Sequence, residues 1–324
     1  MIEKNCNVLI AWDSLPHAGW VASKKSIVQG RDKSTYEVNM ALSETLFRSV
    51  LYIPGSKNRA LEKARSLAVD AIIFDLEDAV APDEKTMARG VLAGELTVGG
   101  YGYRYRMVRI NALNTEWGAE DADAVAKMDC DAILLPKVES PDDIDALRAK
   151  APNLPVWCMI ETPRGVLNAL AIADHPAVKG FVLGTNDLAK DLGCDTGGDR
   201  AAMMAALQTT LMAARAAGIA CVDGVFNAFK DDAGFRMEAA QGAALGMDGK
   251  SLIHPAQIDI TNATFAPSAD EIDLSNRQIE AYDAAIAKGE AVAVVDGKIV
   301  ENLHIETAQA VLAKANAIRE RESS

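Results

Sequence analysis

The sequence predicts an α/β fold: a closed (β/α)8 TIM barrel followed by a small C-terminal extension. From residue 49 onward, short apolar runs alternate with stretches that have helical spacing. The runs are continuously apolar, as expected of parallel strands that are covered on both faces. Eight strand–helix units fit into about 210 residues, close to the size that such a barrel requires.

The eight expected strands are evenly spread along the chain. They cover residues 49–54, 71–78, 105–111, 132–138, 156–162, 180–187, 220–226 and 246–254. Helix starts are also marked, since Ser140 precedes Pro141 in the manner of an N-cap residue before a first-turn proline. An open doubly wound sheet is the alternative, although no GxGxxG motif follows the first strand to indicate a dinucleotide site.

Two segments flank the expected barrel, which spans residues 44–266. Residues 1–43 have no clear periodicity and form an N-terminal extension of unknown role; Met40 is a natural alternative start. Residues 267–324 form a lid or oligomerisation segment. A capping box from Ser268 to Glu271 opens a helix to about residue 288, a hairpin turns at Asp296-Gly297, and a last helix follows from about 304 to 321.

Composition excludes several classes of function. The net charge is −13 and the pI about 4.8, so there is no basic stripe for nucleic acid. No apolar run is long enough to span a membrane, and no signal peptide is evident. The five scattered cysteines include no CxxC pair and indicate free thiols in a reducing cytoplasm.

Carboxylates at the expected strand ends indicate a metal site. Glu161 and Asp187 end successive strands, where the loops of a barrel place functional side chains. With no Cys or His nearby, the pair suits a hard cation such as Mg²⁺, which prefers oxygen ligands.

Further polar residues gather at the neighbouring strand ends. Asp75, Glu77 and Asp78 crowd the second strand end, and like charges so close together need a cation or a shared proton. Arg109 ends the third strand, where its planar guanidinium would pair with a substrate carboxylate or with one of these acids.

The turn after the first strand opens a helix whose amides could hold an anion, or it is an ordinary strand-to-helix turn. It contains Gly55, Ser56, Lys57 and Arg59.

Taken together, these motifs resemble a known family. The segments RSVLYIPG (48–55), FDLEDAV (74–80), VRIN (108–111), LPKVE (135–139), IET (160–162) and GTNDL (184–188) are similar to those of the citrate lyase β-subunit-like family. Malyl-CoA and β-methylmalyl-CoA lyases are its relatives within the HpcH/HpaI aldolase superfamily. The resemblance implies a Mg²⁺-dependent, homotrimeric or homohexameric barrel that acts on an acyl-CoA thioester and a small 2-oxo acid.

The resemblance also implies residue roles. Glu161 and Asp187 match the metal ligands, Arg109 matches the arginine that holds the substrate carboxylate, and Glu77 and Asp78 match the acids beside it. Gly55, Ser56 and Arg59 lie where such enzymes contact CoA. One departure concerns the C-terminal segment that carries a catalytic Asp into a neighbouring subunit, because Glu301 stands at that position. The catalytic acid–base is therefore expected to be Glu301 in trans or Asp78 in cis.

These residues support several reactions. The first hypothesis is a carbon–carbon lyase that cleaves or forms a hydroxyacyl-CoA of the malyl-CoA, β-methylmalyl-CoA or citryl-CoA type. The alternatives are a (3S)-malyl-CoA thioesterase, a citrate lyase β-like accessory subunit, and a pyruvate-type aldolase that acts on free hydroxy acids.

Overall fold

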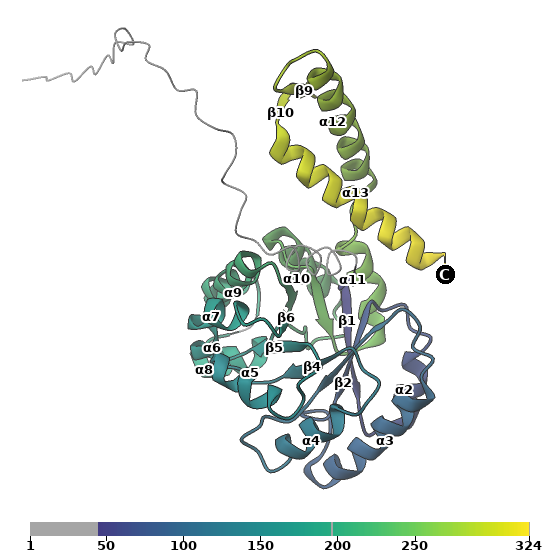
Figure 1. Cartoon of the computed structure of the whole chain (residues 1–324), viewed down its shortest axis with the longest axis vertical. Coiled ribbons are helices and arrows are strands. Elements are labelled where there is room, and N and C mark those ends of the chain that lie inside the picture. Colours follow the sequence, from purple (N-terminus) through teal and green to yellow (C-terminus); the bar gives the residue numbers. More distant parts are fainter. Residues whose placement is uncertain (1–44, 196, 324) are drawn as a thin grey trace, which may run out of the picture. The chain divides into compact units, whose positions relative to one another are not determined.

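A closed barrel of eight parallel strands forms the centre of the computed structural model, which describes residues 45–195 and 197–323 (Figure 1). Each strand pairs with the next, and β8 pairs with β1. The expected (β/α)8 architecture is therefore confirmed. The strands are β1 (Ser49–Pro54), β2 (Ala71–Asp75), β3 (Tyr105–Arg109), β4 (Ala132–Leu135), β5 (Val156–Ile160), β6 (Val178–Leu183), β7 (Ala220–Asp223) and β8 (Gly249–Leu252).

Helices follow the strands and cover the outside of the barrel. They are α2 (Asn58–Ala64), α3 (Lys85–Val98), α4 (Gly118–Val125), α5 (Pro141–Arg148), α6 (Pro163–Leu167), α7 (Ala169–Ala173), α8 (Thr185–Leu192), α9 (Met204–Ala217), α10 (Asp232–Leu245) and α11 (Ile258–Thr264). Three short 3₁₀ turns precede α3, α9 and α11: η1 (Pro82–Glu84), η2 (Ala201–Met203) and η3 (Pro255–Gln257). The expected cap is present, since Ser140 and Asp143 form a capping box with Pro141 in the first turn of α5.

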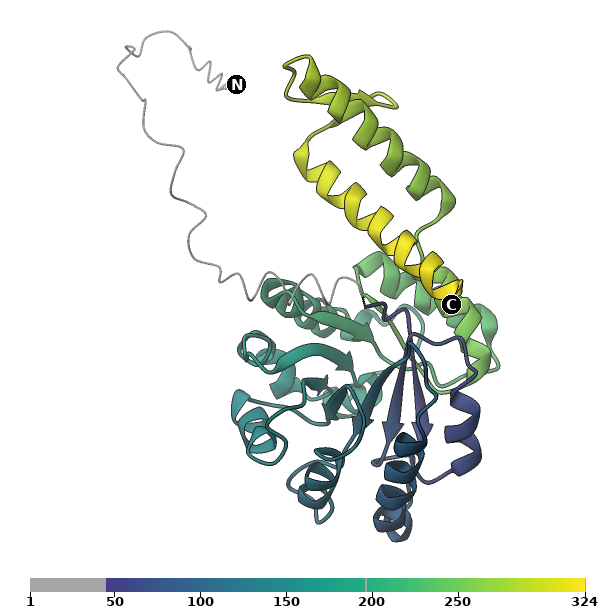
Figure 2. The same ribbon diagram turned by 45° about the vertical axis from the view of Figure 1, so that its right-hand side comes forward.

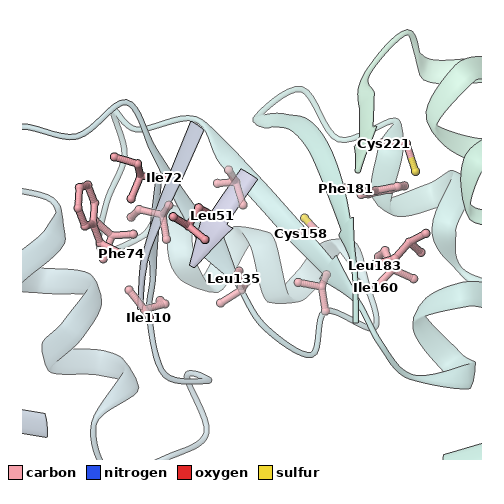
Figure 3. Close-up of a cluster of buried hydrophobic side chains, with 14 of the residues drawn as sticks. Leu51, Ile72, Phe74, Ile110, Leu135, Cys158, Ile160, Phe181, Leu183 and Cys221 are labelled. Carbon is pink, nitrogen blue, oxygen red and sulfur yellow. The ribbon is translucent and has the colours of Figure 1, made fainter. Parts of the chain in front are cut away.

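The larger part of the core lies between the strands and the helices. Outward-facing side chains such as Ile72, Phe74, Cys158 and Phe181 are fully buried there (Figure 3). Because the helices cover this face and inward side chains fill the other, the strands are apolar on both sides. The four described cysteines, Cys130, Cys158, Cys194 and Cys221, are free thiols; Cys6 lies outside the described residues.

An aromatic cluster fills the half of the barrel that lies at the amino ends of the strands. The Phe47 ring packs edge-on against Trp157 and Tyr105, with centroids 4.8 and 5.3 Å away. Trp157 is fully buried, and Gly180 on the neighbouring strand leaves room for its indole. Side chains therefore fill this half of the barrel.

A helical hairpin follows the barrel, and Figure 2 shows its two long helices side by side. They are α12 (Ala269–Ala287) and α13 (Asn302–Glu322), joined by the antiparallel strands β9 (Ala293–Val295) and β10 (Lys298–Val300). The capping box of Ser268 and Glu271 opens α12, as the sequence predicts. Among the described residues no helix is long and apolar enough to cross a membrane.

The last turn of α13 is fixed to the end of the barrel where the strands begin. Arg321 forms a 2.8 Å ion pair with Asp70, which directly precedes β2, and its guanidinium lies 4.8 Å from the centre of the Tyr103 ring. Asp70 is itself buried and accepts bonds from the backbone and side chain of Arg48. The extension is therefore tied to the end of the barrel opposite the carboxyl ends of the strands.

The packing around Trp157 generates a stability prediction. A Cβ at position 180 would lie 2.5 Å from the indole ring, so Gly180→Ala forces a rigid, buried group to move. We expect a loss of about 1–3 kcal/mol in the free energy of unfolding, measured by urea denaturation. Gly90→Ala is the control, because Gly90 is exposed within α3 and a methyl group added there would meet no atom within 4 Å. It should be neutral or stabilise by up to about 1 kcal/mol; equal behaviour of the two variants would contradict this interpretation.

Candidate active site

The carboxyl ends of the strands surround a cavity of about 310 Å³. That volume suits a small ligand, and its position is where barrels of this kind place their active sites. Most of the strands, or the loops that follow them, contribute to it. The lining residues are Tyr52, Asp75, Asp78, Ala79, Arg109, Met159, Glu161, Leu183, Gly184, Thr185, Asn186, Asp187, Val225, Asn227 and Ile253.

Arg109 at the end of β3 is the buried cation of this cavity. Its Nε and Nη2 donate to the two carboxylate oxygens of Asp75 at 2.7 and 2.6 Å. Its Nη1 lies 2.8 Å from Glu77 and 3.4 Å from Asp78. Burial alone would lower the pKa of Arg109, but the carboxylates of Asp75 and Glu77 raise it well above its usual value. The guanidinium is therefore permanently charged, and its longest carboxylate contact is the one from Nη1 to Asp78.

The acids after β2 have different environments. Asp75 is buried and fully engaged, whereas Asp78 at the mouth of the cavity is mostly exposed, with 72% of its side chain accessible. Burial raises the pKa of Glu77 to about 7, against the opposing effect of Arg109 and with a further increase from Asp78. β2 ends at Asp75, so Glu77 and Asp78 lie on the loop and not on the strand where the sequence pattern put them.

Glu161, directly after β5, is held in place by its surroundings. Its Oε1 accepts a 2.7 Å bond from the backbone N–H of Lys137, whose φ of 53° turns that amide toward the cavity. Gly184 faces the other carboxylate oxygen so closely that any side chain there would collide with it. Burial raises the pKa of Glu161 to about 7, against the lowering effects of the Lys137 bond and of Arg109 and with a smaller raising effect of Asp187.

Asp187 reaches the same cavity from a different element than expected. The sequence placed it at the end of a strand, but β6 ends at Leu183 and Asp187 lies in the first turn of α8. A carboxylate is favourable there because the helix dipole is positive at its amino end. Glu161 and Asp187 thus present two carboxylates to one cavity, an arrangement whose mutual repulsion a cation would relieve.

Five of the nine predicted site residues are not part of the cavity lining: Glu77, Gly55, Ser56, Arg59 and Glu301. Gly55 is buried and donates its N–H to the carbonyl of Asp75, Ser56 donates to Glu84, and Arg59 is exposed on α2. Glu301 precedes α13, where its N–H bonds to His304. Arg321, near the C-terminal end of α13, is fixed to the end of the barrel where the strands begin, so Glu301 lies about 30 Å along the helix from this anchor.

Several lining residues were missed by sequence reasoning. Tyr52 points inward from β1, and its ring lies 4.9 Å from the guanidinium carbon of Arg109. Asn227, on the loop after β7, donates its side-chain amide to the side-chain oxygen of Asn186 in the first turn of α8 at 2.8 Å. Tyr52 and Asn186 stand inside the recognised motifs, so strand alternation and proximity to Asp187 could have identified them, whereas Asn227 has no such signal.

Comparison with known proteins agrees with this architecture. The HpcH/HpaI aldolase/citrate lyase family matches residues 48–255. A (3S)-malyl-CoA thioesterase from Cereibacter sphaeroides (strain KD131 / KCTC 12085) is 60% identical over 272 residues, covering 84% of this chain and 95% of the relative. Citrate lyase subunit beta from Escherichia coli (strain K12) is 35% identical over 288 residues, covering 84% and 95%.

Solved structures of one related protein have the same fold. CitE from Mycobacterium tuberculosis, in complex with magnesium, acetoacetate and coenzyme A, is 28% identical with a TM-score of 0.73, and the match covers 84% of this chain and 99% of that chain. CitE in complex with oxaloacetate and magnesium is 31% identical with a TM-score of 0.62, covering 69% and 99%. Together with the matched motifs, these findings show that the chain belongs to the HpcH/HpaI aldolase/citrate lyase family.

Proposed function

We propose that this chain is a Mg²⁺-dependent enzyme of CoA thioesters that hydrolyses (3S)-malyl-CoA to malate and CoA. The observation that carries the proposal is one cavity lined by two carboxylates, Glu161 and Asp187, and by the buried cation of Arg109. The sequence motifs by themselves indicate a carbon–carbon lyase. The 60% identity to (3S)-malyl-CoA thioesterases now favours hydrolysis over carbon–carbon cleavage.

Glu161 and Asp187 are the residues that would hold the metal. Their four carboxylate oxygens are the hard donors that Mg²⁺ requires. Residues 45–195 and 197–323 contain no cluster of three or more His, Cys, Asp or Glu side chains that could hold a metal, so the pair is the candidate site. Two protein ligands suit Mg²⁺, which retains water and substrate oxygens in its shell. The metal supplies Lewis-acid polarisation of a substrate oxygen when it is bound.

Arg109 would fix the carboxylate of the malyl group. Its Nε and Nη2 are occupied by Asp75, so the guanidinium is rigid before substrate arrives. Its Nη1 lies 2.8 Å from Glu77 and makes a longer 3.4 Å contact with the exposed Asp78, and a substrate carboxylate can replace Asp78 there. A charge-assisted bond from a preformed donor gives both affinity and orientation.

Asp78 would be the proton carrier within one chain. Water adds to the thioester carbonyl, Asp78 accepts its proton, and the C–S bond then breaks. The CoA thiol leaves with the proton held by Asp78, and the new carboxylic acid ionises to malate. Asp78 suits this role because its side chain lines the cavity and remains accessible to solvent.

Glu301 is the alternative acid–base, and it would act in a neighbouring chain of a homo-oligomer, for which a trimer or hexamer is expected. Its own chain holds it on the extension that is anchored at the far end of the barrel. Beside it, Val294, Ile299 and Leu303 are exposed, and Val294 and Ile299 are cross-strand neighbours on one face of the hairpin. An apolar face next to a catalytic acid favours contact with another subunit.

Carbon–carbon cleavage is the second candidate, supported by the 35% identity to citrate lyase subunit beta. The same residues would bind the same thioester, but the hydroxyl group would lose its proton and the adjacent carbon–carbon bond would break to give glyoxylate. The resulting enolate would take up a proton to become acetyl-CoA. An accessory-subunit role, free hydroxy-acid substrates and a cytoplasmic location remain predictions from the sequence.

Product analysis tests the reaction and its metal site. Purified protein with Mg²⁺ and (3S)-malyl-CoA should release malate and free CoA, whereas glyoxylate and acetyl-CoA would establish the lyase instead. Glu161→Gln and Asp187→Asn should lower kcat/KM by at least about 100-fold, because each removes a charged ligand. Asp191→Asn, one turn later on α8, is the control and should leave it unchanged. The absence of any thioester reaction would refute the proposal.

Subunit exchange tests the placement of Glu301. Alone, Glu301→Ala should lose about 100-fold or more in kcat, the usual contribution of an acid–base group. Co-expression with Glu161→Gln should restore activity, since roughly a quarter of the sites in a random cyclic oligomer combine an intact barrel with an intact neighbouring extension. If both variants fold and assemble but their mixture stays inactive, Glu301 does not act in trans.

The raised pKa of Glu77 predicts a pH dependence of stability in EDTA. A glutamate titrates near 4.3 when unfolded and at about 7 in the folded protein, so the folded state holds the extra proton between these values. Stability therefore falls as the pH rises from about 5 to about 7.5, by roughly 2–3 kcal/mol from this group. Urea denaturation at both pH values should show this fall in the wild type and a smaller one in Glu77→Gln; equal slopes would contradict it.

A further inference from the structure

The loop after β2 is held from two sides. The carboxylate of Asp75 accepts bonds from the backbone N–H groups of Glu77 and Ala79, both at 2.9 Å. From the opposite side, the ammonium group of Lys85 donates to the carbonyl oxygens of Leu76 at 3.1 Å and Glu77 at 2.8 Å. Both backbone polar groups of Glu77 are therefore fixed.

Lys85 opens α3 and is only 6% exposed. Its third bond goes to the side-chain oxygen of Asn111 at 2.7 Å, and its Nζ lies 5.0 Å from the centre of the Trp117 ring. Within the described ranges no carboxylate forms an ion pair with it. A buried cation is costly without compensation, and here the compensation comes from three oxygen acceptors and an aromatic face.

Asn111 connects this cation to the end of β3. Its side-chain amide donates to the carbonyl of Leu76 at 2.8 Å and to Asp121 at 2.6 Å, and its backbone N–H also donates to Asp121. Asn111 lies two residues after Arg109. Lys85 thus joins the loop that carries Glu77 to the strand that carries Arg109.

We propose that Lys85 is a positioning residue that holds Glu77 against Nη1 of Arg109, so that this guanidinium edge is aligned for the substrate carboxylate. The inference rests on the proposed role of Arg109. Lys85 does not line the cavity and touches no substrate; it acts only through the loop. Without it, the carbonyls of Leu76 and Glu77 lose a shared donor, and the Glu77 carboxylate is no longer fixed at 2.8 Å from Arg109.

Arg89 provides a matched control on the same helix. It lies one turn after Lys85 and is also largely buried. It pairs with Asp121 and Glu120, and in the described part of the chain it has no bond to the loop after β2. Lys85→Met and Arg89→Met each remove one such cation from α3. Only the first change removes a contact to Leu76 and Glu77.

Calorimetric titrations with Mg²⁺ alone, and with oxaloacetate in the presence of Mg²⁺, test the inference. Lys85→Met should weaken oxaloacetate binding by about 10- to 100-fold, the range seen when supporting hydrogen bonds of a site are removed. Its Mg²⁺ affinity should stay within about 2-fold, because Glu161 and Asp187 are held by other elements. Lys85→Arg should be intermediate, because a planar fork cannot reach all three acceptors. Arg89→Met should weaken oxaloacetate binding much less than Lys85→Met, because Arg89 reaches the loop only through Asp121 and Asn111.

Wild-type oxaloacetate affinity in Lys85→Met, or equal losses in Lys85→Met and Arg89→Met, would overturn the inference. Loss of Mg²⁺ binding together with oxaloacetate binding would also overturn it, since that pattern indicates general structural damage. The assay does not depend on turnover. If the wild type hydrolyses no malyl-CoA, the proposed function fails while the binding comparison still decides the role of Lys85.

Discussion

The bidentate pair between Arg109 and Asp75 is the interaction on which the site depends. A guanidinium is expensive to bury, and two short bonds to one carboxylate offset that cost. The same carboxylate accepts two backbone N–H groups, so Asp75 sets the path of the loop that follows β2. One ion pair therefore fixes the cation, the loop and, through the loop, the positions of Glu77 and Asp78. Removing Arg109 would leave the Asp75 carboxylate in the wall of the cavity without its cation, and removing Asp75 would leave Arg109 with Glu77 and Asp78 alone.

The fold was largely predictable from the sequence because its signal is local. Runs of apolar residues located all eight strands, and capping residues located the starts of α5 and α12. The ends of the strands were less predictable. Leu76, Ile110 and Val138 are buried beyond the last strand residues, so hydrophobicity continues after the ladder of hydrogen bonds has ended. For this reason several expected strands were too long, and Asp187 was assigned to a strand although it begins a helix.

The candidate site was predictable in part. Strand-end charges gave Asp78, Arg109, Glu161 and Asp187, and the structure brings all four into one cavity. Sequence could not decide whether Arg109 pairs with substrate or with acids, and the structure shows that Asp75 and Glu77 already engage it. The roles of Lys85, Lys137 and Gly184 depend on contacts between elements that are distant in sequence. Glu301 raises a different difficulty, because its proposed function requires a second copy of the chain.

The aromatic cluster of Phe47, Tyr105 and Trp157 determines the route by which substrate enters and products leave. It closes the barrel at the amino ends of the strands, so the cavity opens to solvent between the loops at the carboxyl ends of the strands. Substrate and products then use the same opening, so the products must leave by the route along which the substrate entered. An extension of a neighbouring subunit that covers this opening would have to move away in every catalytic cycle. In that case the turnover rate would depend on how fast the contact between subunits opens as well as on the chemical step.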